Sequence, residues 1–194
     1  MTRLLLTPAR ACILAIDAGA VSGHALCAPE AGRHALLDSG YCGDWDEREQ
    51  VCRDAVVAAD TRYLPLVVVA EDWPSGAFPN ATAYASVRES WGAWAQAIAS
   101  AAGDTQPPIV RVYVATWRAA LGLRPVVDAT VRAKPERDRS RAAWKRSAVL
   151  AVHGRYGLTV QDDEAEAICI ATWGAHSAEV AAVLAPKKRR RAAA

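Results

Sequence analysis

The stretch over residues 11–26, ACILAIDAGAVSGHAL, begins with a continuous apolar run that ends at a single acid, Asp17. A run of this length in front of a small-residue turn indicates a short strand that is buried on both faces. A carboxylate at the end of such a strand costs free energy unless it is hydrogen-bonded, paired or bound to a metal. Asp17 is therefore a cap of the turn at Ala18 and Gly19 or a ligand, and this stretch leaves both open.

Length and composition favour one domain, which we expect over residues 1–185. The 23 Lys and Arg nearly balance the 21 Asp and Glu, so the net charge alone indicates no polyanionic partner. Basic residues instead gather between residues 132 and 146 and in a basic tail over residues 186–194. The five cysteines contain no CxxC pair, which favours free thiols in a reducing compartment, and we expect a cytoplasmic protein. No apolar stretch reaches the roughly 18 residues of a membrane span, so we expect no membrane partner.

Hydrophobic periodicity predicts three strands, a helix, a strand, a helix, a strand and then further helices. The predicted strands cover residues 12–16, 24–28, 35–42, 64–70 and 109–114. The predicted helices cover residues 44–60, 80–102, 115–123, 140–156 and 162–184. Residues 124–140, with two prolines and many charges, predict a mobile basic loop. Hairpins that lead through a helix into a parallel strand indicate an α/β fold, with a mixed five-stranded sheet flanked by helices.

Three further acids are candidates for the same site as Asp17. The apolar run over residues 64–70 ends at Glu71, as the first run ends at Asp17. In the last predicted helix, Asp163 and Glu166 are three residues apart and therefore share a face, although they could equally form a capping box. Acids that meet from separate elements repel one another unless a cation lies between them. Oxygen ligands without a His or Cys cluster favour Mg²⁺ or Mn²⁺.

The segments ILAIDAG with Gly23, VVVAED and DDEAEAICIA resemble the signature segments of RuvC-type Holliday junction resolvases, in the ribonuclease H-like superfamily. The resemblance runs in order over most of the chain, and it implies a ribonuclease H-like fold. It also implies a crossover junction endodeoxyribonuclease that cleaves Holliday junctions or other branched DNA with two Mg²⁺ or Mn²⁺ ions. Cutting two symmetric strands implies a homodimer, for which the helix over residues 80–102 is a candidate interface. The implied metal-binding and catalytic carboxylates are Asp17, Glu71, Asp163 and Glu166.

The chain departs from the family pattern at several positions. Ala18 stands where the family commonly has proline, and Glu166 stands where it commonly has aspartate, which lengthens the arm. Pro74 stands where RuvC has an aromatic residue that enters the junction, so Trp73 or Phe78 could replace it or be ordinary loop residues. The segment over residues 116–123 looks more like phage members of the family than like the cellular enzyme.

Lys145 resembles the active-site lysine of the family and could neutralise the scissile phosphate, or lie on a solvated helix face. We interpret Gly19 and Gly23 as small residues that let a nucleic-acid backbone come close. The predicted DNA-binding residues, with the arginines as sequence-independent phosphate contacts, are Trp73, Phe78, Arg118, Lys134, Arg137, Arg139, Arg141 and Lys145.

Two other functions share parts of this pattern. An ASKHA-type phosphotransferase or ATPase has the same strand-hairpin start and an Asp-x-Gly that binds phosphate through Mg²⁺, but it usually needs a second domain. A non-catalytic ribonuclease H-like module would bind nucleic acid as a scaffold. Intact acids at all four positions argue against the second alternative.

Overall fold

The structure is a computed structural model that describes residues 9–19, 22–30, 33–72 and 81–185. Trp73, Phe78 and the basic tail over residues 186–194 lie outside the described residues. Within the described part of the chain, no single helix is long and apolar enough to cross a membrane. The last two helices pass that test only as a pair, with a bend of 60° between them. All five cysteines are free and buried.

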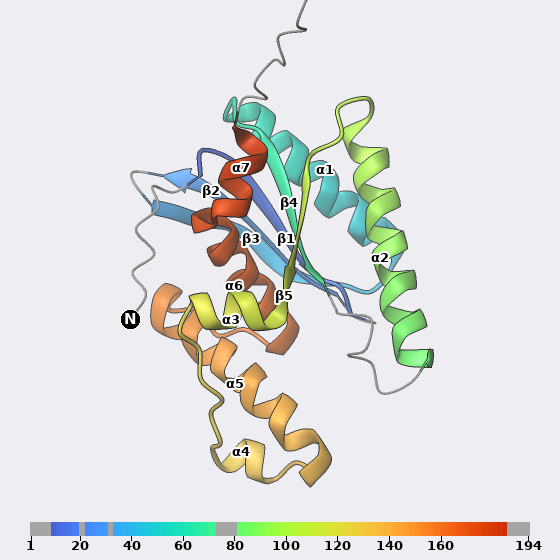
Figure 1. Cartoon of the computed structure of the whole chain (residues 1–194). Helices are drawn as coiled ribbons and strands as arrows, with labels where there is room; N and C mark the ends of the chain where they lie inside the picture. Colours follow the sequence, from blue (N-terminus) through green and yellow to red (C-terminus); the bar gives the residue numbers. More distant parts are fainter. Residues whose placement is uncertain (1–8, 20–21, 31–32, 73–80, 186–194) are drawn as a thin grey trace, which may run out of the picture.

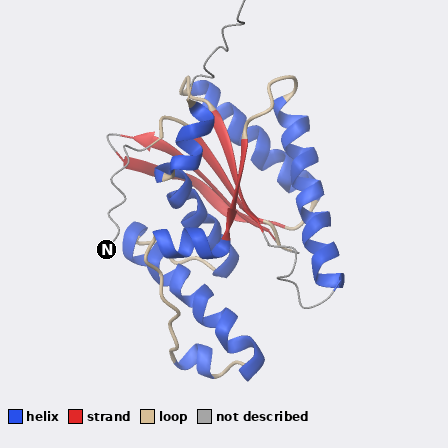
Figure 2. Cartoon of the chain, viewed as in Figure 1, coloured by secondary structure: helices blue, strands red, loops and turns tan. Residues whose placement is uncertain are grey.

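One mixed sheet lies at the centre of the molecule (Figures 1 and 2). Its strands are β1 (Cys12–Asp17), β2 (Ser22–Glu30), β3 (Arg33–Cys42), β4 (Leu66–Asp72) and β5 (Ile109–Tyr113). The order across the sheet is β3-β2-β1-β4-β5. The first three strands are antiparallel neighbours, and β4 and β5 run parallel to β1. The predicted α/β fold with a mixed five-stranded sheet is confirmed.

Both faces of the sheet are covered by helices (Figure 1). Alternate residues of β1 point to opposite faces, as the period of two in a strand requires. Leu14 and Ile16 pack with residues of α1 (Trp45–Thr61) and α2 (Ala81–Ala102). Ile13 and Ala15 pack on the other side, in a cluster with residues of four other helices. These helices are α3 (Val114–Ala120), α5 (Glu136–Tyr156), α6 (Asp162–His176) and α7 (Ala178–Leu184).

Helix α6 lies unusually close to the sheet near its C-terminal end. A Cβ atom added to Gly174 would lie 2.9 Å from Cγ2 of Val69 and 3.3 Å from Cγ2 of Ile13. Both distances are at or below the limit of ordinary van der Waals contact, so the missing side chain permits this approach. The residues of α6 from Ala165 to Ala175 are all buried, which places this helix in the core.

The segment over residues 124–140, which we predicted to be a loop, is partly helical. It contains α4 (Ala129–Arg132), and α5 begins at Glu136 rather than near residue 140. The cause is Asp128, whose side chain caps α4 by accepting from the backbone N–H groups of Thr130 and Val131. Its other oxygen accepts from Nε of Arg146 at 2.6 Å, which ties the segment to α5.

The predicted helix over residues 162–184 is two helices. The chain turns at Ser177, whose hydroxyl oxygen accepts from the backbone N–H of Val180 and caps α7. A hydroxyl at an N-cap offers the backbone an alternative to the continuous helix, so α6 ends and α7 starts at this residue.

Candidate active site

The C-terminal ends of β1 and β4 bring two acids side by side. The strands are parallel neighbours in which Ile16 pairs with Ala70, so the next residues, Asp17 and Glu71, lie next to each other. Both are buried, with 8% of Asp17 and 5% of Glu71 exposed. Two carboxylates are therefore held beside each other at the edge of an apolar core, a costly arrangement without a compensating cation.

The start of α6 brings two more acids to the same edge. Helix α6 begins at Asp162 behind Gln161, whose side chain makes no capping hydrogen bond. Asp163 is thus inside the first turn instead of at the N-cap, and the capping-box interpretation of Asp163 and Glu166 is wrong. Glu166 is buried with 5% exposed, while the side chain of Asp163 is 28% exposed.

Gly23 sets the position of this turn. A Cβ atom on Gly23 would lie 2.1 Å from the carbonyl oxygen of Asp163 and 2.4 Å from its carbonyl carbon. We interpreted Gly23 as a gap for a nucleic-acid backbone, and this interpretation is wrong. The space beside Gly23 is filled by the backbone of α6, because only a residue without a side chain lets β2 and the helix approach so closely.

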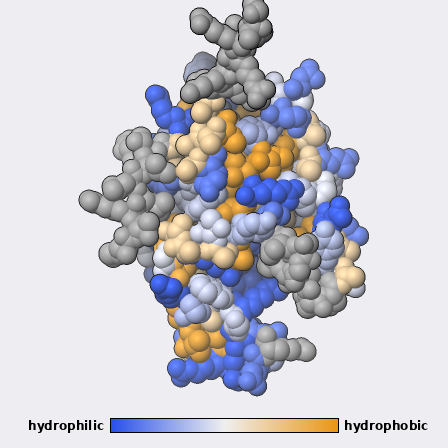
Figure 3. Space-filling model, in the orientation of Figure 1, coloured by the Kyte–Doolittle hydropathy of each residue, from blue (hydrophilic) through white to orange (hydrophobic). Residues whose placement is uncertain are grey.

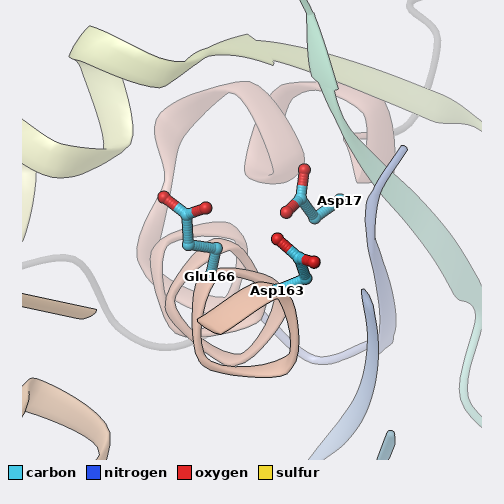
Figure 4. Close-up of side chains that lie close together, drawn as sticks. All are labelled: Asp17, Asp163 and Glu166. Atoms are coloured by element: carbon cyan, nitrogen blue, oxygen red, sulfur yellow. The ribbon is translucent and has the colours of Figure 1, made fainter. Parts of the chain in front are cut away.

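Three of the four predicted carboxylates meet. Asp17, Asp163 and Glu166 each offer an oxygen that lies within 4.8 Å of the oxygens of the other two. Figure 4 shows Asp17 approaching from the end of β1, and Asp163 and Glu166 from the start of α6. Glu71 lies beside this group and is close enough for its charge to raise the pKa of Asp17.

The electrostatics of the cluster fit a divalent cation. Burial raises the pKa of Asp17 well above its usual range, and the charges of Glu71, Glu166 and Asp163 raise it further. Burial and the charge of Glu166 raise the pKa of Glu71 to about 7. Ionisation of Asp17 and Glu71 is therefore unfavourable unless a further cation lies close to them. Since every donor atom is a carboxylate oxygen, a hard ion such as Mg²⁺ or Mn²⁺ suits the set.

Two basic side chains reach the same carboxylates. The Nζ of Lys145, on α5, is bonded to Asp163 and lies 3.8 Å from Oε2 of Glu166. Lys145 is 12% exposed, so it does not lie on a solvated helix face. Arg118, on α3, forms an ion pair with the other oxygen of Glu166. Each of the two acids on α6 thus has its own cation.

The fold of this chain is similar to that of solved structures, although the sequences differ widely. No protein-family model and no curated protein matches the chain. Thermus thermophilus RuvC in complex with a Holliday junction substrate is similar over 85% of this chain and 93% of that chain, with 19% identity and a TM-score of 0.55. Another structure of Thermus thermophilus RuvC is 21% identical over 88% of this chain and 96% of that chain, with a TM-score of 0.53. The chain has the ribonuclease H-like fold of RuvC.

Trp117 is a residue of the candidate site that sequence reasoning missed. Its indole Nε1–H donates to Oε1 of Glu71 at 3.0 Å, and the residue is fully buried. The hydrogen bond favours the ionised carboxylate and opposes the rise in the pKa of Glu71. In the sequence, the segment around Trp117 was notable only because it resembles phage members of the family. Its residue spacing does not indicate a contact with a strand residue 46 positions earlier.

We expect Trp117→Phe to lower the free energy of unfolding by about 1–3 kcal/mol more than a matched control. The substitution keeps a buried ring but leaves Oε1 of Glu71 without its donor. The control is Trp94→Phe, because Trp94 is also fully buried and its Nε1 has no partner among the described residues. Urea unfolding of the two variants without metal measures the difference. Equal losses would mean that the bond to Glu71 contributes nothing.

The remaining predicted DNA-binding residues of the RuvC-like chain lie on or near α5. Lys134, Arg139 and Arg141 are exposed, at the end that α4 and the start of α5 form (Figure 1). Arg137 lies in the first turn of α5. Arg118 is separate from this group, because its side chain is only 17% exposed and points to Glu166.

Proposed function

We propose that this protein is a metal-dependent endonuclease that cleaves Holliday junctions or other branched DNA by hydrolysis of phosphodiester bonds. The observation that carries the proposal is the meeting of Asp17, Asp163 and Glu166 within 4.8 Å, beside Glu71, in a RuvC fold. One of the similar RuvC structures is a complex with a Holliday junction substrate, which supports branched DNA as the substrate class.

Four carboxylates would hold Mg²⁺ or Mn²⁺, with two ions per site. A bound ion of this kind lowers the pKa of a coordinated water and stabilises charge on a reacting phosphate. Asp17, on which the charges of the other three acids act, would be a ligand of this metal site. Lys145 would hold a positive charge beside the scissile phosphate. Burial of Asp17, Glu71 and Glu166 would limit the competition from bulk water for the charges in the site.

The DNA would lie across the end of the molecule formed by α4 and the start of α5. Hydrophilic residues line the outer rim of this end (Figure 3), and the exposed Lys134, Arg139 and Arg141 give it a positive charge. Arg137 belongs to the same segment. Trp73 or Phe78 would enter the junction. A homodimer with α2 at its interface would cut two symmetric strands, and the five free thiols suit a cytoplasmic protein.

A nuclease assay tests the proposal directly. Purified protein is incubated with four-way, three-way, flap and linear DNA, each with Mg²⁺, Mn²⁺ or EDTA, and ATP hydrolysis is measured in parallel. We expect cleavage of branched DNA with either metal ion and none with EDTA. ATP hydrolysis without DNA cleavage would favour the phosphotransferase alternative instead. Binding of branched DNA without any cleavage would favour a non-catalytic module.

Joint replacement of Arg137, Arg139 and Arg141 by glutamine should weaken junction binding and flatten its salt dependence. Each lost phosphate contact reduces the slope of log K against log salt by roughly 0.9, so three contacts reduce it by about 2.7. Fluorescence anisotropy with a labelled four-way junction at several salt concentrations measures the slope. As a control, Arg53 and Arg62, which are exposed at α1 on the opposite face of the sheet, are replaced together. A slope that stays the same in the triple variant would exclude this segment from the DNA contact.

A further inference from the structure

Arg118 occupies a carboxylate that the proposed metal site needs. Its Nη2 atom is paired with Oε1 of Glu166, and 17% of the Arg118 side chain and 7% of the Glu166 side chain are exposed. A buried charge pair of this kind breaks only if another cation replaces the lost partner, because an unpaired buried carboxylate is costly. A metal ion and Arg118 therefore compete for the same group.

The guanidinium is held in place by two aromatic rings. The Cζ of Arg118 lies 5.0 Å from the ring centroid of Trp117 and 5.1 Å from that of Trp144. Both distances are within the range of favourable cation–π contacts. Trp117 is in turn anchored to Glu71 by its indole hydrogen bond. The position of Arg118 at Glu166 is thus supported by α3 and α5 together, rather than being a flexible surface contact.

The charges around the site allow one ion more readily than two. With all groups ionised, the four carboxylates and the two cations Arg118 and Lys145 carry a net charge of −2. One divalent ion neutralises this charge, whereas a second would leave an excess of positive charge in a buried place. The second ion becomes favourable only when a cation leaves. Among the described acids, Arg118 is ion-paired with Glu166, whereas Lys145 contacts both Asp163 and Glu166.

We propose that Arg118 is a built-in competitor of the divalent ion at Glu166, so that the chain binds one ion tightly and a second ion weakly until Arg118 moves away. The inference rests on the proposed metal-dependent nuclease and names a regulation of its site. If Arg118 leaves Glu166 free for a tenth of the time, the apparent Kd of the second ion is about tenfold weaker than its intrinsic value.

Titration of Mn²⁺ into metal-free full-length protein tests the inference without any turnover. Isothermal titration calorimetry gives the number of ions and their affinities, and electron paramagnetic resonance of free Mn²⁺ checks the count. The variants are Arg118→Gln and, as a control of equal charge change, Arg124→Gln, since Arg124 is exposed and close in sequence. We expect Arg118→Gln to tighten the weaker Mn²⁺ site about tenfold, and Arg124→Gln to leave it unchanged.

Thermal unfolding provides a second readout. Without metal, Arg118→Gln leaves Glu166 without its guanidinium partner, so its Tm should fall below that of the wild-type protein. Saturating Mn²⁺ should raise the Tm of this variant by more than it raises that of the wild type. If Arg118→Gln does not fold, Arg118→Lys takes its place, because it keeps a cation but lacks the planar fork. Its weaker Mn²⁺ site should bind Mn²⁺ more tightly than that of the wild type.

The outcomes separate the two proposals. Mn²⁺ binding by the wild type with no gain in Arg118→Gln overturns the role of Arg118 and leaves the metal site intact. An equal increase in Mn²⁺ affinity in Arg124→Gln also overturns it, because the increase would then come from the change in net charge rather than from the loss of the contact with Glu166. Absence of Mn²⁺ binding by both the wild type and Arg118→Gln overturns both the competitor and the proposed nuclease.

Discussion

We expect Asp17→Asn to reduce cleavage of branched DNA in the presence of Mg²⁺ by roughly 10³-fold or more, and to leave junction binding within a few-fold of the wild type. Asparagine has nearly the volume of aspartate and keeps one oxygen, so the fold is preserved. The charge is lost at the carboxylate that lies within 4.8 Å of both Asp163 and Glu166. Single-turnover cleavage assays and anisotropy binding assays on the same four-way junction measure the two effects.

The unfolding free energy of Asp17→Asn distinguishes a ligand from a turn cap. Burial and three neighbouring acids raise the pKa of Asp17, so the ionised side chain is unfavourable in the metal-free protein. We therefore expect the metal-free variant to be as stable as the wild type or more so, whereas loss of a cap would cost about 1 kcal/mol.

The control for a cap is Asp44→Ala. Asp44 caps α1 by accepting from the backbone N–H of Glu47 at 2.9 Å, so this variant should lose about 1 kcal/mol and keep its activity. Glu71→Gln and Asp163→Asn should behave as Asp17→Asn does in the cleavage assay. Cleavage at the wild-type rate by Asp17→Asn would show that the four acids are not the catalytic site.

Gly23→Ala is expected to inactivate the protein and to lower its free energy of unfolding by several kcal/mol, although it adds one methyl group. The new Cβ would lie 2.1 Å from the carbonyl oxygen of Asp163, which is backbone and cannot rotate away. Either β2 or the start of α6 must shift, and a shift of the helix moves Asp163 and Glu166 together. Misplacement of catalytic groups by about 1 Å can cost about 10²-fold in rate.

The matched control for Gly23→Ala is Gly154→Ala. Gly154 lies in α5, is exposed, and would place its Cβ in open space, so alanine should stabilise the helix by up to about 1 kcal/mol. Urea unfolding, Mn²⁺ affinity and cleavage are measured for both variants. Gly23→Ala with wild-type metal affinity would mean that the β2–α6 contact does not position the acids.

Local pattern was sufficient for most of the sheet. The run CILAI and the run LVVVA are apolar at every position, and a strand covered on both faces is the arrangement that buries all of them. The antiparallel hairpins and the parallel crossover strand also followed from the pattern, whereas the order of the strands across the sheet came from the structure. The sequence offered Asp44 or Asp46 as the N-cap of α1, and the structure has Asp44 in that position.

Helix faces and helix ends could not be read in the same way. For α5 we can predict a buried stripe from hydrophobicity alone as Trp144, Val149, Leu150 and His153, yet Leu150 is 40% exposed and His153 is exposed. Trp144 and Val149 are half-buried, and the buried positions are Ala143, Ser147, Ala148 and Val152. Small residues are buried there because α5 packs closely on α6, and a long side chain would hold the helices apart.

Sequence by itself determined the acids: Asp17 and Glu71 each end a buried strand, and parallel pairing of those strands is enough to make them neighbours. Only the tertiary structure decided what surrounds them. Trp117 and Arg118 come from a helix that is far along the chain from either strand. The need for glycine at Gly23 comes from a helix 140 residues later in the sequence. Such contacts depend on how closely elements pack across the core, and no spacing within one segment records that distance.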